Sequence, residues 1–249
     1  VDVIIPAQAA TSTAITGGQA RARVEAPQLP GGIVTIGRAE SSVDADFDDK
    51  TAAVQFTYGN HAENDLPART TTSAVVHDLA VTVRGDGTER VVKAGRIEMQ
   101  LVSRSPRNGE PSIQPVKAEI EGLTLDGVPL KVHLRAKMFC DHDTREKLCQ
   151  AYESDDQFYS ETRHMLLHPA PSTSASYERK LPAGETLLCT MVDRLEWTGQ
   201  PHPDATIQGN AVYLKDFGTI YFAEIFVGKE SRRLTMMRFH LGSPQGGEL

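Results

Sequence analysis

The chain has 249 residues, a formal net charge of −7 and 39% hydrophobic residues, which is the composition of a soluble globular protein. The acidic balance argues against nucleic acid or an anionic membrane as the main partner, because phosphate binding relies on clustered Lys and Arg. The apolar runs are far too short for a membrane span. Three cysteines form no secreted disulfide framework, so we expect a cytoplasmic protein, with secretion after cleavage of a signal peptide before Val1 left open.

Residues 1–32 mix small residues with Thr, Pro and Gly, and we expect them to form an extended N-terminal arm. Chain termini are usually poorly ordered unless they are tied down. The arm is therefore expected to dock on a neighbouring copy or on its own sheet. Residues 33–249 are expected to form a single β-rich domain.

From Ile33 onward the apolar residues alternate, which predicts strands over 33–48 and 51–59. Residues 74–103 predict a hairpin that turns at 85–87. One buried face of its first strand is expected to hold Val75, His77, Leu79, Val81 and Val83. The apolar parity of the second strand switches at Gly95, which predicts a β-bulge there. His77 is interpreted as a core histidine.

Residues 117–139 predict a second hairpin, closed by a three-residue loop at 125–127. This register places Glu121 opposite Lys131, Glu119 opposite His133, and Ile120 opposite Val132 on the other face. Glu119 and Glu121 are thus interpreted as parts of a charged outer face rather than as catalytic groups.

Capping boxes at Asp143/Glu146 and Ser154/Gln157 predict two helices, over 144–152 and 155–167. Strands return over 187–197, 210–227 and 232–241, and the last two predict a hairpin. Both faces of residues 219–227 are largely apolar, so this strand is expected to be central. The predicted fold is mainly β, an antiparallel β-sandwich or barrel with a short helical insertion around residues 143–168.

The stretch FCDHDTREKLC, residues 139–149, has the residue types of a metal site, with His164 and His168 following it. Cys140, His164 and His168 are the candidate ligands. Their spacing does not match the structural zinc classes, and helix capping explains the stretch more simply, so no metal is expected. The alternating acids of residues 44–48 fail the EF-hand pattern and are interpreted as a solvated strand face.

The candidate catalytic residues are charged groups on otherwise apolar strands: Glu224, Arg238, His240 and Asp193. A five-residue loop would pair Phe226 with Leu234 and Glu224 with Met236, and Arg238 would then lie diagonal to Glu224. The cluster could perform acid/base chemistry or anchor a ligand, or it could be a structural ion pair. The sequence lacks nucleophile-elbow, P-loop and dinucleotide-binding motifs, and no cofactor is expected.

Two functions follow from these patterns. The first is a non-enzymatic structural or binding protein that self-assembles through its N-terminal arm and strand edges, as a homo-oligomer or with a protein partner. The alternative is an enzyme or small-ligand binder with a β-sandwich or barrel cavity lined by Glu224, Arg238 and His240, and covered by residues 169–185. Whether the chain is an enzyme stays open at this point.

Overall fold

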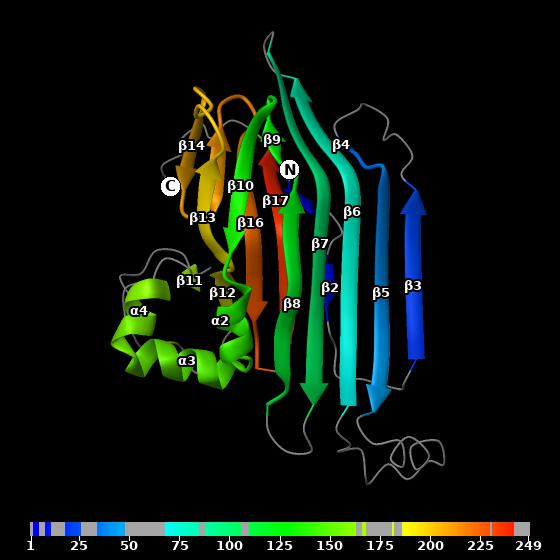
Figure 1. Ribbon diagram of the computed structural model, residues 1–249, viewed down its shortest axis with the longest axis vertical. Helices are drawn as coiled ribbons and strands as arrows, with labels where there is room; N and C mark the ends of the chain where they lie inside the picture. Colours follow the sequence, from blue (N-terminus) through cyan, green and yellow to red (C-terminus); the bar gives the residue numbers. More distant parts are fainter. Residues whose placement is uncertain are drawn as a thin grey trace.

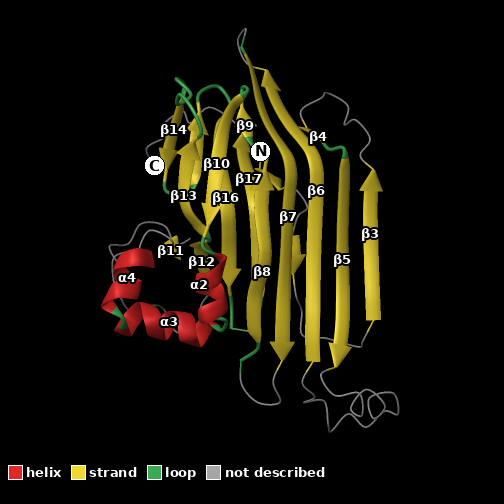
Figure 2. Cartoon of the chain, viewed as in Figure 1, coloured by secondary structure: helices red, strands yellow, loops and turns green. Residues whose placement is uncertain are grey.

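A computed structural model describes residues 2–4, 8–10, 18–25, 34–47, 68–84, 88–105, 110–162, 166–167, 181, 186–229 and 231–241. Two antiparallel sheets lie face to face, with three short helices at one corner (Figures 1 and 2). The predicted mainly β fold is confirmed in its sandwich-like form, because neither sheet closes into a barrel through its described strands. The predicted strand over 51–59 lies outside the described residues.

The larger sheet, sheet I, has the order β3-β5-β6-β7-β9-β10-β13, with β4 beside β6 and β8 beside β7. Its described strands are β3 (Gly18–Glu25), β4 (Val34–Thr35), β5 (Arg38–Phe47), β6 (Ala68–Arg84), β7 (Glu89–Ser105), β8 (Ser112–Glu121), β9 (Thr124–Leu125), β10 (Val128–Leu134) and β13 (Val192–Trp197). Strands β6 and β7 form the predicted first hairpin, with Arg84 opposite Glu89.

The smaller sheet, sheet II, has the order β1-β17-β16-β12-β11. Strand β2 also pairs with β17, β15 pairs with the first half of β16, and β14 pairs with β15. Its described strands are β1 (Asp2–Ile4), β2 (Gln8–Ala10), β11 (Leu166–Leu167), β12 (Leu187–Thr190), β14 (Ala205–Gln208), β15 (Ala211–Leu214), β16 (Gly218–Val227) and β17 (Arg232–Leu241). Strand β16 is central, as predicted, and four successive residues from Phe222 to Ile225 are at most 3% exposed.

The described parts of the N-terminal arm pair with both sheets of their own chain. Strands β1 and β2 add to β17 in sheet II, whereas β3 adds to β5 in sheet I. Of the two docking places expected from the sequence, the chain's own sheets are the one observed.

A row of four residues, Gly37, Asp78, Gly95 and Gly122, crosses sheet I, and we call this row the crease. It determines which residues of the longest strands are buried. Asp78 has a φ of +52° and lies with Gly95 between the pairs His77–Arg96 and Leu79–Ala94. The buried residues on either side of it are three positions apart on both strands, Val76 and Leu79 on β6 and Ala94 and Ile97 on β7.

Each strand therefore accommodates one extra residue at the same level, so one face of the sheet stays buried along its whole length. The parity switch predicted at Gly95 is present, but a one-sided bulge was wrong because both strands switch together. The single buried face predicted for β6 was also wrong, since Val75 and His77 are only half-buried and Val76 is buried instead.

Glycines continue the crease on both sides. A Cβ on Gly37 would lie 2.9 Å from Oδ2 of Asp78, and a Cβ on Gly122 would lie 3.2 Å from the backbone nitrogen of Gly95. Gly122 also has a φ of +64°, which favours glycine. At these two positions of the crease, Gly37 and Gly122, an added side chain would be crowded.

The second predicted hairpin was wrong in register and in partners. Asp126 and Gly127 both have positive φ and form a two-residue turn, so Leu125 pairs with Val128. Strand β8 pairs with β7 rather than with β10, which places Glu121 opposite Arg96 and Glu119 opposite Glu98. On β10, Lys131 faces Glu196 and His133 faces Arg194 of β13.

The helical insertion contains α2 (Ala136–Asp141), α3 (Arg145–Ser154) and α4 (Asp156–Thr162). The predicted caps were each displaced by one residue. Thr144, not Asp143, accepts a hydrogen bond from Lys147 N at the start of α3. Asp155, not Ser154, accepts from Phe158 N at the start of α4.

Two further boundaries differ from the sequence prediction. Phe139 lies in α2 rather than at the end of a strand, and Leu166 and Leu167 form β11 rather than the end of a helix. Strand pairing explains the second difference, because Leu166 and Leu167 add to the edge of β12.

The chain passes from sheet II to sheet I at Met191, between β12 and β13. Met191 N donates to Ala223 O (2.9 Å), and Met191 O accepts from Arg135 N (2.7 Å). Ala223 has a φ of +48°, and the hydroxyl of Thr190 donates to the neighbouring Phe222 O (3.1 Å). These hydrogen bonds connect the two sheets, whose buried residues form one continuous hydrophobic core.

The crease leads to a stability prediction. Gly122→Ala should lower the free energy of unfolding by about 1–2 kcal/mol, because the substitution adds both left-handed backbone strain and a close contact with Gly95. Gly209→Ala is the matched control, since Gly209 has a φ of +57° and open space around it. Urea unfolding should show the larger loss for Gly122→Ala, and equal losses would contradict the crowding at the crease.

Candidate functional site

Glu224 and Arg238 form a bidentate ion pair on sheet II. Arg238 Nε and Nη2 donate to the two carboxylate oxygens at 2.7 and 2.9 Å, and Glu224 is only 3% exposed. The guanidinium lies 3.9 Å from the ring centroid of Tyr221, which is the Cα partner of Arg238. Both oxygens of Glu224 thus have a partner, so the pair has the geometry of a structural ion pair.

The register that positions this pair differs from the prediction by one residue. Phe226 pairs with Arg233 instead of Leu234, and Glu224 pairs with Thr235 instead of Met236. The shorter connection is the reason, because Val227 pairs with Arg232 and leaves four residues between the two strands instead of five. The positive φ of Ala223 leaves the register unchanged but turns Glu224 away from the face that buries Phe222.

The other two candidate catalytic residues lie apart from this pair. His240 is exposed on β17 with its backbone opposite Thr219. Asp193 is on β13 in sheet I, where it accepts hydrogen bonds from Arg135 Nε and, at 3.2 Å, from Arg194 Nη1. The structure therefore brings together two of the four predicted residues, Glu224 and Arg238.

The thiols of the cysteine stretch are half-buried, and Cys189 on β12 is buried. Burial raises the pKa of Cys140 and Cys149 and raises that of Cys189 to about 12. The Cys140 thiol donates to Pro115 O (3.4 Å). His164 and His168 lie outside the described residues, and within the described part of the chain no group of three or more His, Cys, Asp or Glu could hold a metal ion.

A buried arginine under this stretch was missed by the sequence reasoning. Arg232 is 2% exposed, and its Nη2 donates to His142 O (2.9 Å) at the C-terminal end of α2. Burial lowers its pKa to about 10. Its Nη1 has no hydrogen-bond partner among the described residues. A cation at a helix C-terminus is favourable, so Arg232 fixes α2 on sheet II.

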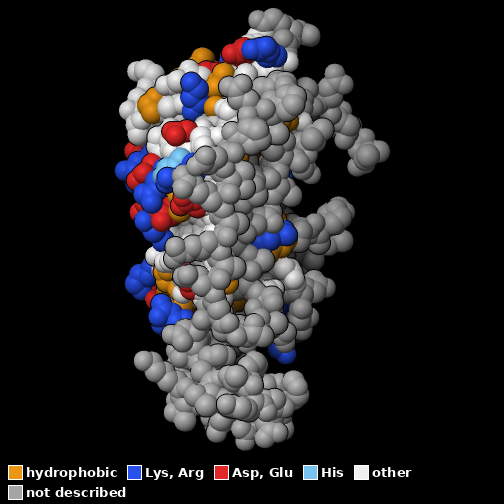
Figure 3. Space-filling view, turned by 90° about the vertical axis from the view of Figure 1, so that its right-hand side faces the viewer, with side chains coloured by type: hydrophobic (Ala, Val, Ile, Leu, Met, Phe, Trp, Pro, Cys, Tyr) orange, Lys and Arg blue, Asp and Glu red, His pale blue; other side chains and the backbone are white. Residues whose placement is uncertain are grey.

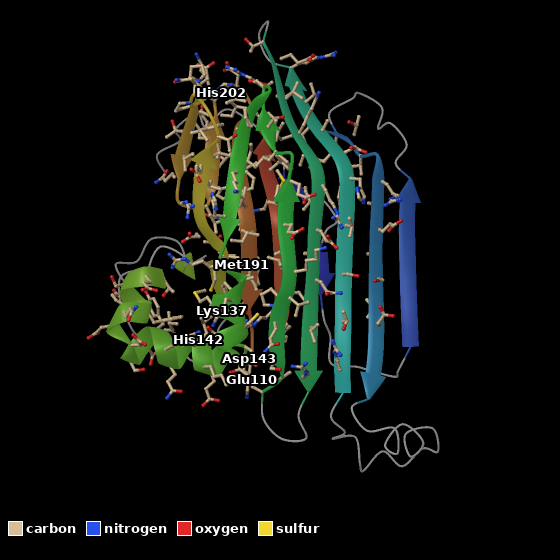
Figure 4. The ribbon with its side chains drawn as sticks, viewed as in Figure 1. Glu110, Lys137, His142, Asp143, Met191 and His202 are labelled. Atoms are coloured by element: carbon tan, nitrogen blue, oxygen red, sulfur yellow. The ribbon has the colours of Figure 1, made fainter. Side chains whose placement is uncertain are left out.

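The N-terminal end of α3 is held in a different way. The carboxylate oxygens of Glu110 accept from Arg145 N (2.8 Å) and Glu146 N (3.0 Å), and Asp143 accepts from Lys147 Nζ (2.7 Å). Figure 4 shows Glu110, His142 and Asp143 together at this end of the molecule, far from His202 at the other.

A second polar network lies at the end near His202. Arg90 donates from Nη1 to Asp126 (2.9 Å) and from Nη2 to Asp204 (2.6 Å). Asp204 N donates to Nδ1 of His202 (3.1 Å), so this nitrogen carries no proton and Nε2 donates to Asp126 (3.2 Å). Both imidazole nitrogens are occupied. The network joins β7, the β9–β10 turn and the segment before β14, which no local pattern could have predicted.

The outer face of sheet I carries charges of both signs, and Figure 3 shows described acidic and basic side chains intermixed along one margin. Glu98 contacts Arg96 (2.5 Å) and Lys117 (2.6 Å), and Glu119 and Glu121 are exposed. The interpretation of Glu119 and Glu121 as outer-face charges agrees with this arrangement. The positive and negative groups offset one another along the sheet.

The two outermost described strands of sheet I, β3 and β13, are of interest for their backbone N–H and C=O groups rather than for reactive side chains. Strand β3 pairs with β5 over eight residues without a register shift and ends the strand order on its side. Strand β13 ends the order on the other side, and its pairing with β10 contains an irregularity. A long, regular edge strand is the kind of surface to which another strand adds.

Comparisons with known proteins give a family and no function. The family model described as "Domain of unknown function (DUF8256)" matches residues 1–228. No curated protein and no solved structure gives a significant match. The described residues include no helix long and apolar enough to cross a membrane.

The Glu224–Arg238 pair gives a stability prediction. Arg238→Met should lower the free energy of unfolding by about 3–5 kcal/mol, because it leaves a buried carboxylate without its partner. The double variant Glu224→Leu/Arg238→Met should recover most of that loss in urea unfolding. A double variant that loses the sum of the losses of Arg238→Met and of the single variant Glu224→Leu would contradict a structural pair.

The Arg90 network gives a pH prediction. The hydrogen bond from Arg90 lowers the pKa of Asp204 from its ordinary 3.8, so folded Asp204 binds a proton less readily than unfolded Asp204. Its contribution to stability is therefore present at neutral pH and disappears as the pH falls through the lowered pKa. Asp204→Asn should flatten the acid loss of unfolding free energy below the ordinary aspartate pKa of 3.8.

Urea unfolding at a series of pH values measures this effect. Glu119→Gln removes one charge at an exposed position and serves as the control. If both variants kept the full acid loss of the unsubstituted chain, the assigned role of Asp204 would be wrong.

Proposed function

We propose that this chain, which belongs to the DUF8256 family, is a non-enzymatic protein that self-associates through strand edges, with β3 as its docking edge. The observation that carries the proposal is the regular eight-residue ladder of β3 on β5, at the end of sheet I. Backbone groups on the outer side of such a strand are available for an added strand. In β-augmentation these groups supply affinity, and the alternating side chains supply specificity.

The state of the ionisable clusters supports a binding role over a catalytic one. Glu224 has both oxygens bound to Arg238, His202 has both ring nitrogens bound, and burial raises the pKa of the three cysteine thiols. A general base or nucleophile needs a group that is free to react. In the described residues these clusters serve the fold.

The two ends of sheet I are not equivalent as docking edges. Strand β13 carries Arg194 and Glu196 at exposed positions, and its ladder to β10 shifts at His133/Leu134. Irregular pairing discourages strand addition. Both strands carry charges, Arg21 and Arg23 on β3 among them, but only the ladder of β3 has an unbroken register. We therefore assign self-association to β3.

Proline substitution tests this assignment because neighbouring N–H groups of a strand point in opposite directions. Ala20→Pro/Ala22→Pro removes donors on one side of β3, and Arg21→Pro/Arg23→Pro removes donors on the other. One double variant should stay folded and shift from an oligomer to a monomer of 27.2 kDa. The other should lose the β3–β5 ladder and unfold more easily.

Light scattering coupled to size-exclusion chromatography measures the mass, and urea unfolding measures the stability. An unsubstituted chain that stays at 27.2 kDa across the micromolar range would contradict the proposal. So would two proline variants that both remain folded and assembled.

A further inference from the structure

We propose that the side of β17 that faces away from β16 is a strand-acceptor site, which β1 and β2 of the same chain fill here and which β1 and β2 of a second copy fill in an arm-exchanged dimer. The inference rests on the proposed function in taking self-association as the role, but it concerns the opposite sheet and names the partner segment. Strand β17 pairs with β16 on one side and with β1 and β2 on the other.

The buried state of β17 shows why this side needs a strand. Leu234, Met236, Met237 and Phe239 are at most 2% exposed. A strand that is apolar on both faces and has an open edge is an aggregation site. β1 and β2 cover that edge, and β2 also packs against β6 and β7 of sheet I. The arm thus closes one side of the sandwich.

The arm is attached by two short ladders. Strands β1 and β2 have three residues each, in contrast to the eight residues of β3 on β5. Their registers on β17 differ by one residue, since Ile4 pairs with Arg238 and Gln8 pairs with Thr235. Pro6 lies between them in the sequence and has no N–H to donate to a ladder.

Such a segment can open while the rest of the sandwich stays folded, because local opening draws on the elements with the fewest backbone bonds. Residues 11–17 connect β2 to β3, and seven residues span up to about 24 Å when extended. β3 can therefore remain on β5 while residues 2–10 reach another molecule. Each chain then donates one arm and accepts one, which closes a symmetric dimer.

The register of β1 and β2 on β17 indicates which residue types an added strand needs at each position. Val3 lies opposite the buried Phe239 and Ala9 opposite the buried Leu234, whereas Asp2 lies opposite the exposed His240. Residues directly opposite each other in an antiparallel pair share a face of the sheet. The acceptor site therefore fits an extended segment with small or aliphatic residues at alternate positions and an acidic residue beside His240.

Engineered cysteines in full-length chains test the exchange. One chain carries Asp2→Cys and a second carries His240→Cys, which are Cα partners. A mixture oxidised under mild conditions should give a covalent dimer of twice the 27.2 kDa chain mass, joined through residues 2 and 240. A second mixture, Ala10→Cys with Arg233→Cys, should do the same through the other ladder.

Two controls make the result decisive. Asp2→Cys mixed with Lys93→Cys, an exposed position on sheet I, measures random collisions. A single chain with both Asp2→Cys and His240→Cys measures whether the pair can form the bond. Dimer yields no greater than the collision control in both mixtures, with closure inside the doubly substituted chain, would overturn the exchange. Failure of the doubly substituted chain to form any bond between residues 2 and 240, either within one chain or between two, would overturn the acceptor site itself.

The two proposals can fail separately. A dimer that survives both β3 proline variants and still shows the linkage between residues 2 and 240 would refute the β3 edge and support arm exchange. A dimer that the β3 variants abolish, without that linkage above the collision control, would support the β3 edge and refute arm exchange.

Discussion

The crease in sheet I is the constraint on which the rest of the fold depends. Strands β6 and β7 are 17 residues long, and the alternation of their buried residues changes parity between Val76 and Leu79 on one strand and between Ala94 and Ile97 on the other. The left-handed Asp78 and the adjacent Gly95 add one residue to each strand at the same level. The halves of the sheet above and below then present one continuous core face to sheet II. Gly37 and Gly122 extend this adjustment to the neighbouring segments.

The polar groups inside the fold are used to hold its parts together. Arg232 fixes α2, Glu110 fixes α3, and Arg90 joins the segments at the other end of the sandwich. Buried charges are costly unless they are paired or hydrogen-bonded, and in the described part of the chain these contacts engage Arg232, Glu110 and Arg90 in the fold. This is why strand edges, rather than a reactive cluster, carry the functional proposals.

Local patterns predicted elements better than they predicted partners. The β6–β7 hairpin and the central position of β16 follow from alternation and apolar content. The Glu224–Arg238 contact was found because a charged residue on an apolar strand needs a partner. The register around it was wrong by one residue, because the connection between β16 and β17 has four residues rather than the expected five. The buried role of Arg232 was missed because α2 and β17 meet only in the folded chain.

The sequence by itself determined that the chain is mainly β, where most of its strands lie and where α3 and α4 begin to within a residue or two, whereas α2 was expected to be part of a strand. Side-chain periodicity and capping depend on neighbours along the chain, so they can be read from it. Only the tertiary structure decided that β8 joins β7, that β10 joins β13, and that the arm adds strands to both sheets. Pairing between distant strands depends on which edges remain open once the core has formed, and that is a property of the whole fold.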